Sequence, residues 1–276
     1  MREALLEAQE QVRDRLRRLG SCVVAFSGGV DSALVLKVAA DVLGKSVVAL
    51  TAVSPSMPKE TLSEAAALVE ELGVQWRRVA SNELADPQYA QNPANRCYFC
   101  KRELYRLCQD ACDALGISAM VDGLNADDLQ DHRPGRAAAQ ERSVCSPLAE
   151  AGLTKVEVRA WSKALGLQGW DRPAMPCLAS RIPYGTSVTE GRLRQIGSAE
   201  TALRELGLRE FRVRYHGETA RLEVSAEELH RFVDPAFRDR ALEVVLASGF
   251  ERAVVDPEPF RSGRLNVFRQ TPSPVP

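Results

Sequence analysis

An apolar run that breaks into a glycine turn constrains this chain more than any other feature. Residues 23–26 are Val-Val-Ala-Phe, and Ser-Gly-Gly-Val-Asp-Ser follows at 27–32. The apolar run is typical of a buried parallel strand, and residues 33–44 have the pattern of a helix. The turn therefore joins the carboxyl end of a strand to the amino end of a helix.

This turn has the chemistry of a phosphate site. Two adjacent glycines let backbone N–H groups point at one anion, and the helix N-terminus adds partial positive charge. The hydroxyls of Ser27 and Ser32 can donate as well, and a carboxylate at Asp31 suits the site if Mg²⁺ accompanies the phosphate. The alternative is a strand–turn–helix that uses small residues for packing alone.

The hexapeptide at 27–32 resembles the pyrophosphate loop of the N-type ATP pyrophosphatases, the PP-loop superfamily. The Walker A pattern G-x-x-x-x-G-K-[ST] is absent. The resemblance implies that ATP is cleaved between its α and β phosphates and that the substrate becomes adenylylated. It also implies an ATP site made by Ser27, Gly28, Gly29, Asp31 and Ser32.

Composition excludes several classes of protein. The 276 residues are 45% hydrophobic and 26% charged, as in ordinary globular proteins. The net charge of −1 differs from the strongly positive charge that is typical of nucleic-acid-binding proteins. No apolar run approaches the ~20 residues of a membrane span, and the acid-containing N-terminal pattern is not that of a signal or transit peptide. We expect a cytoplasmic protein that binds neither nucleic acid nor membrane.

The first part of the chain alternates strand and helix patterns, which predicts an α/β fold with a doubly wound parallel sheet. Ligands of such sheets bind beyond the carboxyl ends of the strands. The loop after the fourth strand, with Asn125, Asp127 and Asp128, is therefore expected beside the glycine turn as part of the ATP site. A solvated acidic turn is the alternative. Further strands are expected at 46–53, 74–80 and 119–123, and helices at 59–72, 98–115 and 153–166.

A different pattern begins after an irregular, proline-rich segment at 167–188. It predicts a smaller C-terminal α+β domain for substrate binding and oligomerisation. We place the PP-loop domain at 1–185 and this domain at 186–276. Its expected elements are a helix at 190–206, a hairpin at 211–215 and 220–225, helices at 226–232 and 235–247, and a strand at 252–256.

The chain has seven cysteines, and their spacing separates possible metal ligands from packing residues. The spacing of Cys97 and Cys100 lets two thiolates meet at one metal centre. Cys108 lies about 12 Å farther along the same predicted helix, at ~1.5 Å per residue, so Cys108 and Cys112 are expected to pack as buried small hydrophobes. Cys177 lies in the irregular segment near an arginine, where a thiol can act as a nucleophile or a cluster ligand.

The segments PCLASRIPYG at 176–185 and RVRYHG at 212–217 resemble the LarE family, together with the glycine turn. LarE proteins are ATP-dependent sulfur transferases that mature the nickel-pincer cofactor of lactate racemase. The resemblance covers almost the whole chain. It implies that ATP adenylylates a carboxylate of pyridinium-3,5-biscarboxylic acid mononucleotide, and that sulfur then displaces AMP to give a thiocarboxylate. Repetition at the second carboxylate gives the bisthiocarboxylic form.

The resemblance leaves the sulfur source open. In one branch of the family the single cysteine of the PCLASR segment gives up its own sulfur and becomes dehydroalanine. Here Cys97 and Cys100 accompany Cys177, as in the cluster-bearing branch, and three thiolates can hold a 4Fe–4S cluster with one iron open. Expected cofactors are thus ATP, Mg²⁺ and a 4Fe–4S cluster. Zinc, or a sacrificial Cys177 beside an unrelated C-x-x-C, are the alternatives.

Charged residues of the C-terminal part complete the predicted site. Arg212 and Arg214 alternate along one strand and so share a face, where two guanidinium groups suit a phosphate. A solvent-facing ladder of salt bridges is the alternative. The resemblance places Ser180, Arg181, Glu200, Arg212, Arg214 and Glu223 at the substrate or metal site.

Other functions fit less well. A tRNA-thiolation enzyme shares the PP-loop and the C-x-x-C, but the near-neutral charge argues against RNA binding. An amidotransferase-type synthetase would leave the cysteines without a role, and no glutaminase domain is recognisable. A non-catalytic nucleotide sensor is the third alternative. The resemblance also implies a homo-oligomer.

Overall fold

The computed structural model describes residues 2–130, 134–173 and 175–260. The chain divides into two compact units, one formed by residues 1–86 and 95–175, the other by residues 87–94 and 176–276. The second unit thus begins ahead of the expected boundary at 186. Side-chain contacts within this unit are the reason: Arg181 is ion-paired with Glu200, and the side chain of Asn92 donates to the carbonyls of residues 182, 183 and 186.

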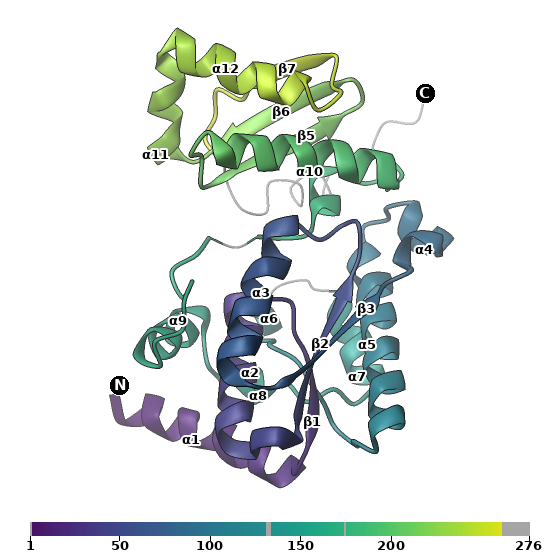
Figure 1. The fold of residues 1–276 in the computed structure, drawn as a ribbon, viewed down its shortest axis with the longest axis vertical. Helices are drawn as coiled ribbons and strands as arrows, with labels where there is room; N and C mark the ends of the chain where they lie inside the picture. The colour runs from purple at the N-terminus through teal and green to yellow at the C-terminus, as the bar shows by residue number, and fades with distance from the viewer. Residues whose placement is uncertain (1, 131–133, 174, 261–276) are drawn as a thin grey trace. The chain divides into compact units, whose positions relative to one another are not determined.

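A four-stranded parallel sheet forms the centre of the first unit (Figure 1). Its strand order is β3-β2-β1-β4, and each neighbouring pair is parallel. This confirms the predicted α/β fold. The strands are β1 (Cys22–Ala25), β2 (Val47–Val53), β3 (Gln75–Ala80) and β4 (Met120–Val121).

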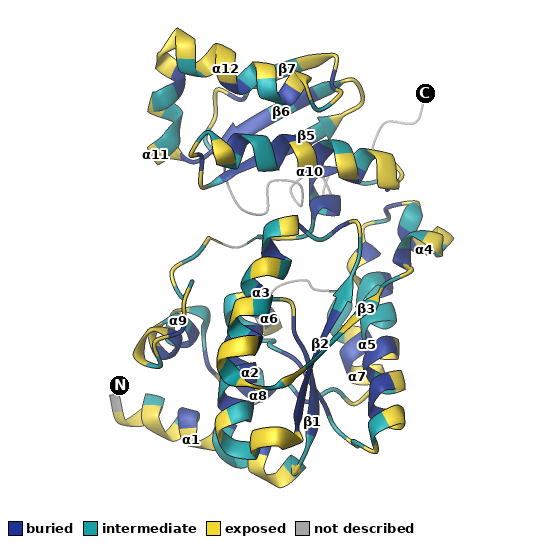
Figure 2. Ribbon diagram, in the orientation of Figure 1, coloured by how far each residue is buried: buried dark blue, intermediate teal, exposed yellow. Residues whose placement is uncertain are grey.

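Helices cover both faces of this sheet. Val24 and Ala49 point to a core shared with α1 (Arg2–Leu19), α2 (Val30–Leu43), α3 (Lys59–Leu72) and α9 (Lys155–Ala164). Their neighbours Val23 and Leu50 point to a second core, shared with α5 (Arg96–Leu115) and α7 (Gly135–Glu141). Because successive strand residues face opposite sides, apolar runs such as 22–26 are buried on both (Figure 2). The sheet is therefore doubly wound.

Across the described ranges, no helix is both long and apolar enough to cross a membrane.

Short elements connect the longer helices and strands. The short elements of the first unit are η1 (Gly44–Ser46), η2 (Glu83–Ala85), α6 (Ala126–Gln130) and α8 (Pro147–Glu150).

The second unit contains a three-stranded sheet of order β5-β6-β7. The predicted hairpin is present as β5 (Phe211–His216) and β6 (Thr219–Val224), which are antiparallel, and β7 (Arg252–Val255) pairs with β6 in parallel. The helix expected at 226–232 is instead an α-turn followed by a 3₁₀ turn. The remaining elements are α4 (Pro87–Ala90), η3 (Leu178–Arg181), α10 (Glu190–Glu205), α11 (Ala226–Leu229), η4 (His230–Val233) and α12 (Pro235–Leu246).

Candidate functional site

The glycine turn lies between β1 and α2 and requires glycine at its centre. Gly28 has φ +78°, and a Cβ there would lie 3.1 Å from both Cγ2 and the carbonyl oxygen of Thr61 in α3. Gly29 is the N-cap of α2 and has no side chain with which to cap the helix. The first amides of α2 are therefore available to an anion, with the helix dipole behind them.

The two serines of the turn have different roles. The Oγ atoms of Ser27 and Ser32 lie 3.1 Å apart, and Ser32 Oγ donates to the Gly29 carbonyl at 3.0 Å. Ser32 is buried, whereas Ser27 is exposed. Ser32 thus fixes the shape of the turn, and Ser27 presents its hydroxyl where a ligand can reach it.

The segment after β4 packs against the start of α2, as the parallel-sheet argument predicts. A Cβ on Gly123 would lie 2.6 Å from the amide nitrogen of Ser32, so only glycine permits this approach. Asn125 Nδ2 lies 3.4 Å from Asp31 Oδ1. Asn125 and Asp128 are buried and Asp127 is exposed, so the alternative of a fully solvated acidic turn is wrong.

Lys155 also reaches Asp31 beside the glycine turn, and the sequence did not predict this contact. Its Nζ lies 2.5 Å from Asp31 Oδ2, and its backbone N–H donates to Asp127 Oδ2 at 2.9 Å. Thr154 and Glu157 form a capping box that begins α9, which puts Lys155 in the first turn of that helix. The capping box is readable from the sequence, but the partner of the lysine, 124 residues away, is not.

The C-x-x-C pair lies at the start of α5. Cys97 is exposed and Cys100 is half-buried, and their spacing of three residues places them on one face of the helix. Cys108 and Cys112 are buried, as predicted for packing residues, and burial raises the pKa of the Cys108 thiol to about 12. Cys97 and Cys100 are therefore the accessible thiols of this helix.

Glu83 is a second residue that the sequence reasoning missed. Its buried carboxylate accepts hydrogen bonds from the hydroxyls of Ser54 at 2.9 Å and Ser56 at 2.7 Å, and the Cys100 thiol donates to it at 3.4 Å. Glu83 thereby connects the segment after β2 to the C-x-x-C helix. A glutamate in a polar sequence context carries no local sign of burial.

In the second unit, Cys177 is half-buried and precedes the short turn η3. Arg181 within this turn has no exposed surface and binds Glu200 through two hydrogen bonds of 2.8 and 2.9 Å. Burial alone would raise the pKa of Glu200, but the charge and hydrogen bonds of Arg181 outweigh it and lower that pKa. The pair is thus an interior ion pair.

Three further charged residues are buried beside this pair. Arg214 Nε donates to Glu223 Oε2 at 2.8 Å, and Arg212 lies opposite Glu223 in the strand register with its guanidinium over the ring of Phe260. Burial, and then the nearby positive charge of Arg181, lower the pKa of Arg212 to about 10. The alternative of a solvent-facing ladder of salt bridges is therefore wrong.

Comparisons with known proteins identify the family. The NAD synthase family model matches residues 5–93, which include the glycine turn. A protein of Lactiplantibacillus plantarum named pyridinium-3,5-bisthiocarboxylic acid mononucleotide synthase is 38% identical over 252 residues, 91% of either chain. The chain belongs to the LarE family. It is also 46% identical to an uncharacterised protein of Synechocystis, over 95% of this chain and 98% of that one.

A more remote similarity supports the PP-loop fold of this LarE-family enzyme. The NH₃-dependent NAD⁺ synthetase of Chlorobaculum tepidum is 33% identical over 85 residues, which is 30% of this chain and 31% of that protein. The similarity to LarE thus extends over nearly the whole chain, whereas the similarity to NAD synthetases is partial.

The chemical types of the donor atoms match the metals expected for a LarE protein. The oxygens of Asp31, Asn125 and Asp128 are the hard ligands that Mg²⁺ prefers. The thiols of Cys97 and Cys100 on one helix face are ligands typical of an iron–sulfur cluster. Within either unit, the described residues contain no group of three or more His, Cys, Asp or Glu side chains that could hold a metal ion.

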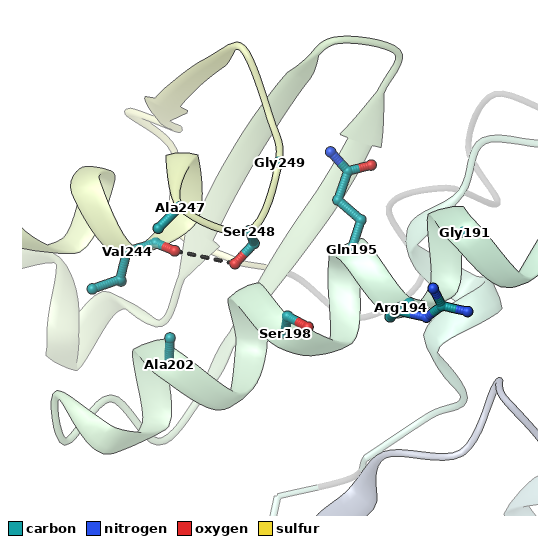
Figure 3. Close-up of a pocket in the computed structure, with 9 residues that line it drawn as sticks. All are labelled: Gly191, Arg194, Gln195, Ser198, Ala202, Val244, Ala247, Ser248 and Gly249. Atoms are coloured by element: carbon teal, nitrogen blue, oxygen red, sulfur yellow. Dashed lines mark hydrogen bonds between the residues drawn. The ribbon is translucent and has the colours of Figure 1, made fainter.

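A hollow in the surface of the second unit is not part of this predicted site. It has a volume of about 570 Å³ and lies along α10 and α12 (Figure 3). Arg194 and Gln195 line it together with glycines and small side chains, and Ser248 Oγ at its wall donates to the carbonyl of Val244 at 3.1 Å. None of its lining residues is among the predicted site residues. The hollow therefore does not point to a ligand of the LarE reaction.

Proposed function

We propose that this enzyme uses ATP to insert sulfur into pyridinium-3,5-biscarboxylic acid mononucleotide, in the synthesis of a nickel-pincer nucleotide cofactor. The name of the Lactiplantibacillus plantarum relative, a pyridinium-3,5-bisthiocarboxylic acid mononucleotide synthase, supports the substrate class. The observation that carries the ATP half of the proposal is the uncapped start of α2, where Asp31 is held by Asn125 and Lys155.

The first step is activation of a substrate carboxylate. A carboxylate oxygen attacks the α-phosphorus of ATP, the bond from that phosphorus to the pyrophosphate oxygen breaks, and pyrophosphate leaves. The amides of Gly28 and Gly29 and the hydroxyl of Ser27 bind the phosphates, and the Lys155 ammonium offsets their negative charge. Mg²⁺, when bound, would be held by oxygens of Asp31, Asn125 and Asp128 and would neutralise phosphate charge.

The second step is sulfur transfer. A sulfur nucleophile attacks the acyl carbon, the bond from that carbon to the AMP oxygen breaks, and AMP leaves with a thiocarboxylate as the product. Cys97, Cys100 and Cys177 are the proposed sulfur-handling residues. When bound by these three thiolates, a 4Fe–4S cluster supplies an iron open to sulfide. The alternative donor is Cys177 itself, whose Cβ–Sγ bond breaks to leave dehydroalanine.

The second unit is proposed to bind the mononucleotide. Arg212 and Arg214 suit its phosphate, and Ser180 lies in the turn η3 that follows Cys177. Residues 186–276 are also proposed to carry the contacts of a homo-oligomer, with the enzyme acting in the cytoplasm on this small molecule.

The test separates the two steps. Anaerobically prepared enzyme, with iron and sulfide supplied, is assayed for pyrophosphate release and for thiocarboxylate by mass spectrometry. Asp31→Asn should lose both signals, whereas Cys177→Ala should release pyrophosphate without forming thiocarboxylate. Asp41→Asn, on the exposed side of the same helix α2, is the matched control and should behave as wild type. Pyrophosphate release only with tRNA would replace this proposal with tRNA thiolation.

The same assay identifies the sulfur donor. A cluster is expected to give a broad visible absorption that Cys97→Ala and Cys177→Ala both remove, together with repeated turnover. An intact mass that falls by one sulfur and two hydrogens after a single turnover would instead identify Cys177 as the sacrificial donor.

A further inference from the structure

The turn that follows Cys177 is too short to hold its own shape. It consists of the four residues of η3, with hydrogen bonds of 2.9 Å from Ser180 N to the Cys177 carbonyl and 3.2 Å from Ile182 N to the Ala179 carbonyl. Single 3₁₀ turns have poor hydrogen-bond geometry and little stability of their own. The direction of the Cys177 side chain therefore depends on what holds the surrounding backbone.

Arg181 holds that backbone on both sides of Cys177. Its Nη1 donates to the carbonyl oxygen of Pro176 at 2.8 Å and to that of Cys177 at 3.3 Å. These carbonyls belong to the two peptide groups that flank the Cα of Cys177. The same nitrogen donates to Ser180 Oγ at 2.9 Å. One guanidinium group thus restrains both peptide planes that orient the thiol.

The guanidinium is itself anchored to the body of the second unit. Its Nε and Nη2 bind the carboxylate of Glu200 on α10, and Glu200 Oε1 accepts a further hydrogen bond from the backbone N–H of Val213 on β5 at 3.0 Å. Arg181 has no exposed surface and Glu200 is 1% exposed. A chain of hydrogen bonds therefore runs from helix and sheet to the peptide groups of Cys177.

The rest of the segment is restrained in the same manner. Arg214, anchored by Glu223, donates from Nη1 to the Ser180 carbonyl at 2.9 Å. Asn92 Nδ2 donates to the carbonyls of Pro183 at 2.8 Å and Thr186 at 2.9 Å. Side chains from distant parts of the sequence thus replace the regular hydrogen bonds that this proline-rich segment cannot form.

We propose that Arg181 is a positioning residue for Cys177 and not a ligand of the substrate. This inference deepens the proposed function and rests on the part of it in which Cys177 handles sulfur. All three guanidinium nitrogens already bind protein acceptors inside the fold. A substrate group would have to displace Glu200 or the backbone carbonyls to reach them, whereas loss of the arginine would release the turn.

The first test is Arg181→Lys. A single ammonium group keeps the charge but cannot bridge a carboxylate and two carbonyls at once. Thiocarboxylate formed per pyrophosphate should fall on the order of 100-fold, as for a reactive group misplaced by ~1 Å. The KM for the mononucleotide in pyrophosphate release should stay unchanged. A raised KM with an unchanged ratio of products would overturn the proposal, because a substrate ligand behaves in that way.

Arg204→Lys is the matched control. Arg204 approaches the same Glu200 carboxylate at 3.8 Å and donates to the Glu200 backbone carbonyl at 3.4 Å, whereas Arg181 donates to the carbonyls that flank Cys177. Arg204→Lys should keep the wild-type ratio of thiocarboxylate to pyrophosphate. An equal fall in both variants would show that disturbance of the ion pair alone is responsible and would contradict the proposal.

A second readout does not depend on catalysis. The rate of Cys177 alkylation by iodoacetamide, measured by peptide mass spectrometry on the whole folded chain, should rise in Arg181→Lys because the released turn exposes the thiol. An unchanged rate would refute the positioning role. If the wild type releases no pyrophosphate with the mononucleotide, the proposed function fails and alkylation still decides this inference. If Arg181→Lys does not fold, Arg214→Lys should show a smaller rise, because Arg214 contacts the Ser180 carbonyl and not the carbonyls that accept from Arg181.

Discussion

The glycine turn of the first unit and the Cys177 turn of the second are both short, but they are held in opposite ways. The segment from Ser27 to Ser32 takes its shape from its own glycines and hydroxyls, and it offers backbone amides to a ligand. The segment 176–181 takes its shape from Arg181 and Arg214, which are anchored by Glu200 and Glu223. A change in the first should therefore affect chemistry more than stability, and a change in the second should affect both.

The largest expected effect tests the anchor of the second turn. Glu200→Ala leaves the Arg181 guanidinium buried without its carboxylate, which costs about 3–5 kcal/mol. Glu190→Ala, on the same helix, removes an exposed pair with Arg194 and should cost no more than ~1 kcal/mol. The free energy of unfolding in urea measures both. Similar losses in the two variants would mean that the interior pair is not the anchor.

A substitution in the glycine turn should slow pyrophosphate release. Gly28→Ala places a Cβ 3.1 Å from Thr61 at a positive φ, so the loop must shift and pyrophosphate release should slow by about 100-fold. Gly73→Ala, at φ +61° with open space around it, carries a similar backbone cost of ~1–2 kcal/mol without that contact. Wild-type pyrophosphate release is expected for Gly73→Ala. Equal rates in the two variants would show that strain, and not loop position, is decisive.

Lys155 is the exception in the glycine turn, because it contacts Asp31 from a helix that is distant in the sequence. Lys155→Met removes a charged contact to Asp31, worth about 1.5 kcal/mol, so pyrophosphate release should slow by about tenfold. Lys163→Met, in the last turn of the same helix α9, is the control and should leave the rate unchanged. A matching decrease in both would assign the effect to the helix and not to the contact with Asp31.

Local patterns account for what the sequence predicted well. The apolar run with its glycine turn, the helix at 59–72 and the hairpin expected at 211–225 all depend on neighbouring residues, and the structure contains each of them. The Asn125 segment was also placed correctly at the edge of the sheet, because parallel topology brings the carboxyl ends of strands together.

Long-range pairing accounts for what the sequence could not predict. Glu83 with Cys100, Lys155 with Asp31, and Arg181 with Glu200 meet only once the elements have packed. Period-2 alternation indicated that Arg212 and Arg214 share a face of β5, but not that this face would be buried. The proline content of residues 167–188 correctly predicted little regular structure. It did not indicate which side chains would hydrogen-bond to the backbone of this segment.

The smallest expected effect is a difference in acid sensitivity. Burial tends to raise the pKa of Glu200, but Arg181 lowers it below the ordinary value of 4.5. As the pH falls below that value the unfolded chain takes up the proton first, so the stability that the charged pair contributes is present above it and is lost on acidification. The melting temperature of the wild type should therefore fall more steeply below pH 4.5 than that of Glu200→Gln, which has no proton to gain. Parallel slopes in the two proteins would mean that the ion pair does not set the acid stability of the Cys177 turn.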